Sequence, residues 1–249
     1  MRDYKEELTK RCEYIRKTVE GAGAKGVVFG NSGGKDCALV GILSRMALSE
    51  DFRVVGVILP CEAKRNFELD ARDARLVNDK FGIETYTVDV TEAKRYIAEK
   101  VGEIAPLNSA ALNNIAPRLR MTSLYAVGAS LNLLVAGTGN KCERFMGYFT
   151  KWGDGGCDFN PISDLTVSEV YEFLKFLDCP REIIEKAPSA ALFEGQTDEM
   201  EMGVTYAEIE DYMAGKEVSD KSKAIIERYH RLSHHKLDPI STFENFEKR

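Results

Sequence analysis

A short run of small and polar residues near the amino terminus has the composition of a loop that binds an anion. The run Gly30-Asn31-Ser32-Gly33-Gly34-Lys35-Asp36-Cys37 follows the apolar sequence GVVF and precedes the apolar-periodic sequence ALVGILSRMAL. That order predicts a strand, a tight loop and a helix. Glycines let the backbone turn tightly and aim successive N–H groups at an anion, and the helix dipole adds to the attraction. A pyrophosphate fits such a loop. The alternative is an ordinary strand-to-helix turn in which Asp36 caps the helix.

Two better-known glycine motifs do not fit this chain. Gly34-Lys35 is followed by Asp36, so the loop lacks the Ser or Thr of a Walker A motif. The run GAGAKG at residues 21–26 matches the dinucleotide fingerprint G-x-G-x-x-G. It follows a predicted helix and precedes a predicted strand, which is the reverse of the context that the fingerprint needs. We therefore interpret it as a helix stop and a turn.

The elements around the loop alternate between strands and helices. Apolar runs predict strands at residues 26–30, 53–60, 84–90 and 133–137, and helical periodicity predicts helices at residues 4–20, 36–49, 67–82, 91–102 and 110–131. This alternation predicts an α/β fold with a doubly wound parallel sheet and helices on both faces. Residues 139–161 show little periodicity and many glycines, which favours an ordered functional loop. The chain from Val167 onward reads as helices with one polar loop at residues 194–203.

Composition and charge exclude several classes of protein. The 249 residues are 44% hydrophobic and form one globular domain spanning residues 1–249 in our interpretation. The formal charge of −6 opposes a broad nucleic-acid surface. We expect no membrane association and a cytoplasmic location, because no apolar run is long enough for a membrane helix and the charged amino terminus has no signal-peptide core. The six cysteines form no C-x-x-C pair, so we expect reduced thiols.

The loop and several later segments resemble one enzyme family. The order S-G-G-x-D-C after a first strand is similar to the pyrophosphate loop of the N-type ATP pyrophosphatases. The segments GTGNK, GYFTKWGDGG, EKAPSAALFEGQTDE and HHK, in this order and at these spacings, resemble the ammonia-dependent NAD synthetases from about residue 4 to 240. The resemblance implies an adenine nucleotide α-hydrolase-like fold. It also implies a homodimer without a glutaminase domain, and a ligase that uses ATP, ammonia and deamido-NAD to release AMP and pyrophosphate.

The resemblance also implies roles for residues of the ATP site. Asp36 and Glu143 match the catalytic, metal-ligating carboxylates, and carboxylates on two separate loops suit Mg²⁺ between phosphate oxygens. Ser189 matches a hydroxyl that contacts both the metal and ATP. The full set implied for ATP comprises Gly30, Asn31, Ser32, Gly33, Gly34, Lys35, Asp36, Cys37, Thr138 and Ser189.

Five further residues match positions that hold deamido-NAD. They are Arg118, Lys151, Asp158, His235 and Lys236. Guanidinium and ammonium groups suit the diphosphate and carboxylate of this ligand, and a carboxylate suits its ribose hydroxyls. Read without the resemblance, each of these side chains is a solvated charge.

The chain departs from the family pattern at two positions of the ATP site. Cys37 replaces the usual serine, and Val167 stands where the family commonly carries a lysine that contacts ATP. Lys35 occupies a loop position that is often uncharged in the family, so the missing charge has either moved to Lys35 or been lost, with Lys35 pointing to solvent. The sequence leaves two alternatives to an NAD synthetase. One is another ATP pyrophosphatase that amidates or thiolates a different substrate, and the other is a catalytically impaired nucleotide-binding homologue.

Overall fold

The computed structural model describes residues 2–62, 67–186 and 198–243. The first half of the chain contains α1 (Tyr4–Gly21), β1 (Gly26–Gly30), α2 (Lys35–Ala47), β2 (Arg53–Ile58), α3 (Phe67–Phe81), β3 (Glu84–Thr87), α4 (Thr91–Gly102) and α5 (Ser109–Leu131). The second half contains β4 (Leu134–Val135), α6 (Lys141–Met146), α7 (Val167–Phe176), α8 (Arg181–Ile184), α9 (Asp198–Met202), α10 (Tyr206–Met213) and α11 (Asp220–Leu237).

Four parallel strands form the sheet in the order β3-β2-β1-β4. Val28 of β1 is aligned with Val55 of β2 and with Val135 of β4, and all three side chains are buried. Short apolar runs of this kind are typical of strands that are covered on both faces.

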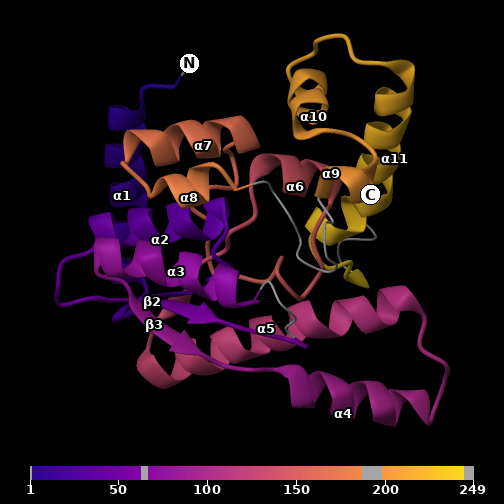
Figure 1. Ribbon diagram of the computed structural model, residues 1–249, viewed down its shortest axis with the longest axis horizontal. Coiled ribbons are helices and arrows are strands. Elements are labelled where there is room, and N and C mark those ends of the chain that lie inside the picture. Colours follow the sequence, from indigo (N-terminus) through magenta and orange to yellow (C-terminus); the bar gives the residue numbers. More distant parts are fainter. Residues whose placement is uncertain (1, 63–66, 187–197, 244–249) are drawn as a thin grey trace.

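Helices cover the two faces of the sheet. α2 and α3 pack on one face and α5 packs on the other (Figure 1). α1 and α7 lie outside α2 and pack against it, so α2 is buried continuously from Cys37 to Ser44. The main core forms between these layers and includes Phe29, Leu39 and Phe173. The first strand and the helix that follows it therefore lie at the centre of the main core.

The strand order reverses between β1 and β4. The chain proceeds from β1 to β2 and β3 on one side, whereas β4 pairs with the opposite side of β1. In doubly wound sheets, ligands bind outside the carboxyl ends of the strands at such a reversal. The loops that leave the sheet there are residues 30–37 after β1 and residues 136–140 after β4.

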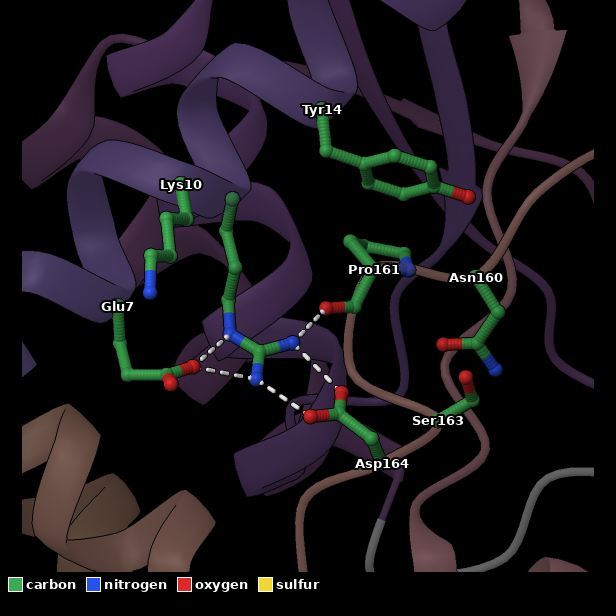
Figure 2. A pocket seen from close by; sticks show the side chains of 8 residues that line it. Glu7, Lys10, Tyr14, Asn160, Pro161, Ser163 and Asp164 are labelled. Carbon is green, nitrogen blue, oxygen red and sulfur yellow. Dashed lines mark hydrogen bonds and ion pairs between the residues drawn. The ribbon is translucent and has the colours of Figure 1, made fainter. Parts of the chain in front are cut away.

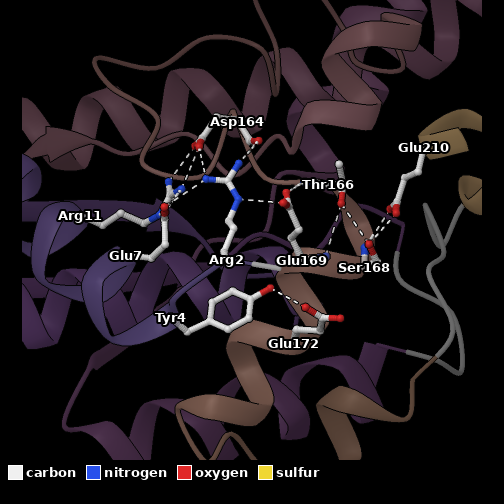
Figure 3. Close-up of polar contacts among 10 residues, drawn as sticks. All are labelled: Arg2, Tyr4, Glu7, Arg11, Asp164, Thr166, Ser168, Glu169, Glu172 and Glu210. Atoms are coloured by element: carbon white, nitrogen blue, oxygen red, sulfur yellow. Dashed lines mark hydrogen bonds and ion pairs between the residues drawn. The ribbon is translucent and has the colours of Figure 1, made fainter. Parts of the chain in front are cut away.

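Ion pairs fasten α1 to the connection that precedes α7 (Figure 3). The Arg11 guanidinium donates to both carboxylate oxygens of Asp164, at 2.7 and 2.8 Å. Nε of Arg2 donates to Oε1 of Glu169 at 2.7 Å. These contacts join the amino-terminal helix to a segment more than 150 residues away, and so they fix the position of α7 over α2.

The carboxyl-terminal helices form a second cluster. α6, α9, α10 and α11 lie together beside the layered part, with the last three shown in orange to yellow in Figure 1. Their shared apolar core comprises Cys142, Met146, Val167, Met202, Val204, Tyr206, Ile209 and Ile226. Val167, the first residue of α7, belongs to this core and thus connects it to the layered part.

The structure confirms the predicted α/β class, the parallel sheet and the helices on both faces. The run GAGAKG ends α1 and turns into β1, with Gly23 at a φ of +63°. Two segments predicted as loops contain short helices, α6 within residues 139–161 and α9 within residues 194–203. Both are too short to show a helical period. The cysteines are free thiols, and no helix in the described ranges has the length and apolarity needed to cross a membrane.

Candidate active site

The glycine loop, residues 30–37, leaves β1 at the carboxyl edge of the sheet. The backbone N–H of Asn31 donates to the Val57 carbonyl at 2.8 Å, which extends the β1–β2 pairing by one residue. Gly33 has a φ of +72°, a left-handed conformation that favours glycine, and Gly34 is the N-cap of α2. The turn at Gly33 therefore directs the chain from β1 into α2.

A chain of hydrogen bonds through buried amide side chains fixes the backbone N–H of Gly33 in this turn. Oδ1 of Asn31 accepts from the backbone N–H of Gly33 at 3.0 Å, and Nδ2 of Asn31 donates to Oδ1 of Asn78 at 3.0 Å. Nδ2 of Asn78 in turn donates to the Thr85 hydroxyl at 2.7 Å. Asn31 and Asn78 are both buried. Because buried amides are costly to leave unpaired, this relay fixes the loop relative to α3 and β3.

An ionic cluster holds the other side of the turn. Nζ of Lys186 lies 2.7 Å from Oδ1 of Asp70 and 3.1 Å from Oδ2 of Asp73, and it also donates to the Gly33 carbonyl at 3.4 Å. The fit is close, because a Cβ at Gly33 would lie 2.3 Å from the Asp70 carbonyl oxygen. The first turns of α3 and Lys186 therefore support the glycine loop directly.

Lys35 is buried rather than directed to solvent, which corrects one of the two sequence-based alternatives. Its side chain is 7% exposed, and Nζ lies 2.7 Å from Oδ2 of Asp36. Nζ also lies 5.8 Å from the ring centroids of Tyr171 and Tyr206. Burial alone lowers the pKa of Lys35, but the carboxylates of Asp36 and Glu143 outweigh burial and raise it. The ammonium group is therefore charged at neutral pH.

Asn140 links the two predicted metal-ligating carboxylates. Nδ2 of Asn140 donates to Oδ1 of Asp36 at 3.4 Å, and its backbone N–H donates to Oε2 of Glu143 at 3.0 Å. Asn140 and Glu143 form a capping box at the start of α6, which fixes the glutamate. Burial and the charge of Asp36 raise the pKa of Glu143 to about 8. The site thus holds two nearby carboxylates that repel each other when both are ionised.

These carboxylates fit the donor set of magnesium. Mg²⁺ is commonly bound by one or two carboxylates together with phosphate oxygens and waters. Asp36 in the first turn of α2 and Glu143 in the first turn of α6 supply two such oxygen donors beside the strand reversal. Among the residues that the structure describes, no cluster of three or more His, Cys, Asp or Glu side chains is arranged to hold a metal ion alone.

Cys37 interacts with Ser32 of the glycine loop and with Thr138, which follows β4. Sγ of Cys37 is 3.4 Å from the Ser32 hydroxyl, which also accepts from the Gly34 N–H at 3.3 Å. Burial raises the pKa of the Cys37 thiol, and the hydroxyls of Ser32 and Thr138 oppose that rise in part. The thiol is therefore protonated at neutral pH. It takes the place of the usual serine hydroxyl and contacts Ser32 within the loop.

Three of the residues predicted for deamido-NAD lie together at a second cluster. Nε of Arg118 on α5 donates to the Lys151 carbonyl at 3.3 Å. Nζ of Lys151 donates to the carbonyl of His235, near the end of α11. The chain thus brings α5, the segment after α6 and the end of α11 to one place.

Lys236 extends this cluster, and its ammonium group already donates to two backbone carbonyls. Its Nζ donates to the carbonyls of Gly147 and Phe149 at 2.6 and 2.7 Å and lies 5.3 Å from the centroid of the Phe149 ring. Burial lowers its pKa. Lys236 therefore braces residues 147–149 in this structure.

Asp158 is not joined to that cluster by any contact in the described ranges. Its Oδ1 accepts from the Tyr125 hydroxyl at 2.9 Å, and its Oδ2 accepts from the backbone N–H of Val135 at 2.8 Å. The carboxylate thus connects β4 to α5. Arg118 lies two helical turns before Tyr125 on α5.

An open pocket lies between α1 and residues 160–164. That pocket has a volume of about 360 Å³ and is lined by Glu7, Lys10, Arg11, Tyr14, Asn160, Pro161, Ser163 and Asp164 (Figure 2). None of the predicted site residues lines it. The Arg11 guanidinium within it is bonded to Glu7 and Asp164.

Sequence reasoning missed several residues that build the site. Asn140 was detectable, because N-x-x-E before a helix is a capping signal. Asn78, Asp70 and Lys186 reach the glycine loop from distant parts of the chain and carry no local motif. Ser189, predicted for ATP and the metal, lies outside the described residues.

Comparisons with known proteins agree with this architecture. A family model described as NAD synthase matches residues 7–244. An NH3-dependent NAD⁺ synthetase of Carboxydothermus hydrogenoformans is 42% identical over 236 residues, covering 94% of this chain and 95% of the relative.

Two solved structures share the fold over the whole chain. An NMN synthetase from Francisella tularensis has a TM-score of 0.91 and 38% identity, covering 97% of this chain and 99% of that one. An NH3-dependent NAD synthetase from Campylobacter jejuni has a TM-score of 0.79 and 27% identity, covering 97% and 100%. With a family match over nearly all residues and a full-length relative at 42% identity, the chain belongs to the NAD synthase family.

Proposed function

We propose that this protein is an ammonia-dependent NAD synthetase that uses ATP to convert the nicotinate carboxylate of deamido-NAD to an amide. The observation that carries the proposal is the pairing of Asp36 and Glu143 through Asn140 beside the glycine loop. This pairing lies at the strand reversal, where doubly wound sheets bind ligands. We propose that residues 1–249 act as one synthetase domain, with free ammonia as the nitrogen donor.

The reaction brings two anions together. An oxygen of the nicotinate carboxylate attacks the α-phosphorus of ATP, the bond to the β-phosphate oxygen breaks, and pyrophosphate leaves. Ammonia then attacks the acyl carbon of the adenylate, AMP leaves and the nitrogen gives up a proton. Because charge builds on the phosphates in the first step, positive groups fixed beside them lower the barrier. Lys35 is such a group, since its buried ammonium lies at the start of α2.

We propose that Asp36 and Glu143 hold magnesium together with the phosphates of ATP. When bound, the ion supplies positive charge to the phosphate oxygens. Burial, and after it the charge of Asp36, raises the pKa of Glu143, so a cation held by both carboxylates would favour the ionised form of Glu143. We propose that Gly30 to Cys37, Thr138 and Ser189 contact ATP, and that Arg118, Lys151, Asp158, His235 and Lys236 contact the acceptor.

A second acceptor is favoured by one comparison. The structure of the Francisella tularensis NMN synthetase matches this chain with a higher TM-score, 0.91, than the Campylobacter jejuni NAD synthetase, 0.79. The same chemistry on nicotinate mononucleotide gives nicotinamide mononucleotide. This acceptor has the reacting carboxylate of deamido-NAD but lacks the adenylate half.

The test is a direct assay with purified protein, ATP, magnesium and ammonia, following AMP, pyrophosphate and the amide product from each acceptor. Under our proposal, deamido-NAD has the higher kcat/KM and raises the melting temperature more than nicotinate mononucleotide does. The reverse order assigns the second acceptor. Turnover with neither acceptor rejects both candidates and favours an impaired nucleotide-binding homologue.

The metal role is tested in the same assay. Asp36→Asn should lower kcat by at least about a hundredfold, which corresponds to roughly 3 kcal/mol in the barrier. Turnover close to that of the wild type at saturating magnesium contradicts the assignment.

We also propose that the protein is a homodimer formed through α4 and α5. These helices extend from the body as an antiparallel pair (Figure 1). The large apolar side chains of α5 are only partly buried, and Tyr96 of α4 and Ile104 just after it are 64% and 86% exposed. An apolar surface of this kind favours an interface. Sedimentation analysis should give twice the chain mass, and a monomer at micromolar concentration rejects the proposal.

A further inference from the structure

Arg120 lies at the carboxyl edge of the sheet, next to the glycine loop. Its Nε donates to the carbonyl of Leu59, just beyond the end of β2, at 2.9 Å. Leu124 is one helical turn further along α5, on the same face of the helix. A Cβ at Gly30 would lie 3.4 Å from Cδ1 of Leu124 and 3.8 Å from Cδ1 of Leu59. Arg120 is therefore held beside the first residue of the glycine loop.

The guanidinium of Arg120 forms no ion pair with any carboxylate in the described ranges. In contrast, Arg11 and Arg53 are each paired at 2.7 Å or less. Arg120 is half-buried, and this burial lowers its pKa, although an arginine stays charged at any ordinary pH. A partly desolvated guanidinium without a counter-ion is unfavourable unless a ligand supplies the anion.

Arg120 also adjoins the segment that follows α6. Asp154 acts on Arg120 electrostatically, as does Cys61, and Oδ1 of Asp154 already accepts from the backbone N–H of Thr150. The same segment carries Lys151 and is braced by Lys236 through Phe149. Arg120 thus lies between the glycine loop and the cluster proposed for the acceptor.

We propose that Arg120 binds an oxyanion of the reaction with the terminal N–H groups of its guanidinium. This proposal rests on the proposed function, because that reaction brings a carboxylate and a phosphate together at this junction. The anion is either the nicotinate carboxylate or a phosphate of ATP, and both match the planar fork of an arginine. Nε already donates to the Leu59 carbonyl, and this bond orients the terminal N–H groups of the guanidinium.

The experiment compares Arg120→Gln and Arg120→Lys with Arg45→Gln. Arg45 is a matched control, because its guanidinium donates to the backbone carbonyls of Leu48, Ser49 and Phe52 at the far end of α2. Affinities for ATP alone, deamido-NAD alone and nicotinate mononucleotide alone are measured by calorimetry, together with kcat and KM. These binding measurements do not require turnover, so they test Arg120 even if the proposed activity fails.

We expect Arg120→Gln to lower kcat/KM by about thirtyfold or more, and Arg120→Lys to recover only part of the loss, because an ammonium lacks the fork. A tenfold weaker affinity for ATP identifies the anion as a phosphate, and the same loss for both acceptors identifies it as the carboxylate. A fall in kcat alone places the contact in the transition state. If Arg120→Gln changes only the melting temperature, as Arg45→Gln should, Arg120 is a backbone brace and the proposal is overturned.

Discussion

The buried ion pair of Lys35 and Asp36 leads to a quantitative prediction. Nζ and Oδ2 are 2.7 Å apart, and the two side chains are 7% and 14% exposed. At an effective dielectric constant of about 20, this separation corresponds to a Coulomb attraction of about 6 kcal/mol before desolvation is subtracted. Removing one partner of a buried pair typically costs about 3 to 5 kcal/mol, because the other charge is left uncompensated.

The perturbation is Lys35→Met, which keeps the length of the side chain and removes its charge. In EDTA we expect the melting temperature to fall by about 6 to 20 °C, since 1 kcal/mol corresponds to roughly 2 to 4 °C for a chain of this size. Magnesium with ATP should shrink the loss, because the bound cation supplies positive charge to the same carboxylates. Lys216→Met is the control. It breaks an exposed pair with Asp211 and should shift the melting temperature by no more than about 3 °C.

The same variant tests whether Lys35 replaces the lysine that the family commonly carries at position 167. Val167 and Tyr206 share one apolar cluster, and Nζ of Lys35 lies 5.8 Å from the Tyr206 ring. Adding Val167→Lys to Lys35→Met should therefore recover part of the kcat/KM for ATP that the single variant loses. Strict additivity of the two substitutions refutes the replacement. A harmless Lys35→Met refutes the electrostatic reasoning altogether.

Two further predictions concern the same site. Gly33→Ala should cost at least about 3 kcal/mol and severely weaken ATP use, because its Cβ would lie 2.3 Å from the Asp70 carbonyl oxygen. Gly23→Ala, at a similar φ of +63° but with open space around it, should cost only about 1 kcal/mol, and equal losses in urea unfolding contradict this argument. Glu143 has a pKa of about 8 when folded, so its burial as a neutral group favours the folded state at low pH, and this contribution is lost as pH rises through 8. In EDTA, the melting temperature of Glu143→Gln should therefore rise relative to the wild type between pH 5 and pH 9, and a gap that is independent of pH contradicts the shift.

The order of the elements was predictable because each strand and helix carries its own signal. β1 and β2 are apolar runs, and the long helices show a clear period. α6 and α9 were not predicted, since five or six residues give no period and their partners lie in other parts of the chain. Tertiary contacts stabilise such short helices, and those contacts leave no local trace.

The site was predictable only where the family motif fixes a residue. The family motif predicted Asp36 and Glu143 on separate loops, whereas the structure has them in the first turns of α2 and α6, and the contact from Asn140 to Asp36 spans 104 residues. The support of Gly33 through Asn78 and Lys186 is likewise long-range, since parallel strands bring distant segments to one edge. The burial of Lys35 depends on Tyr171 and Tyr206, which arrive from α7 and α10. Sequence reasoning left its direction open for that reason.

The structure also changes the role that the glycines have in the loop. Their N–H groups were expected to point at an anion, yet the N–H of Gly33 donates to Asn31 and that of Gly34 donates to the Ser32 hydroxyl. The first bond of α2 is from Ala38 to Gly34, so the N–H groups of residues 35–37 have no acceptor within the helix. The glycines therefore shape the turn, and under our proposal the N–H groups of the first turn of α2 are the ones that donate to phosphate oxygens. Lys35 lies on that same turn, so its buried ammonium and the positive end of the helix dipole lie close together. The effect of Lys35 on a bound anion would therefore depend on its position as much as on its charge.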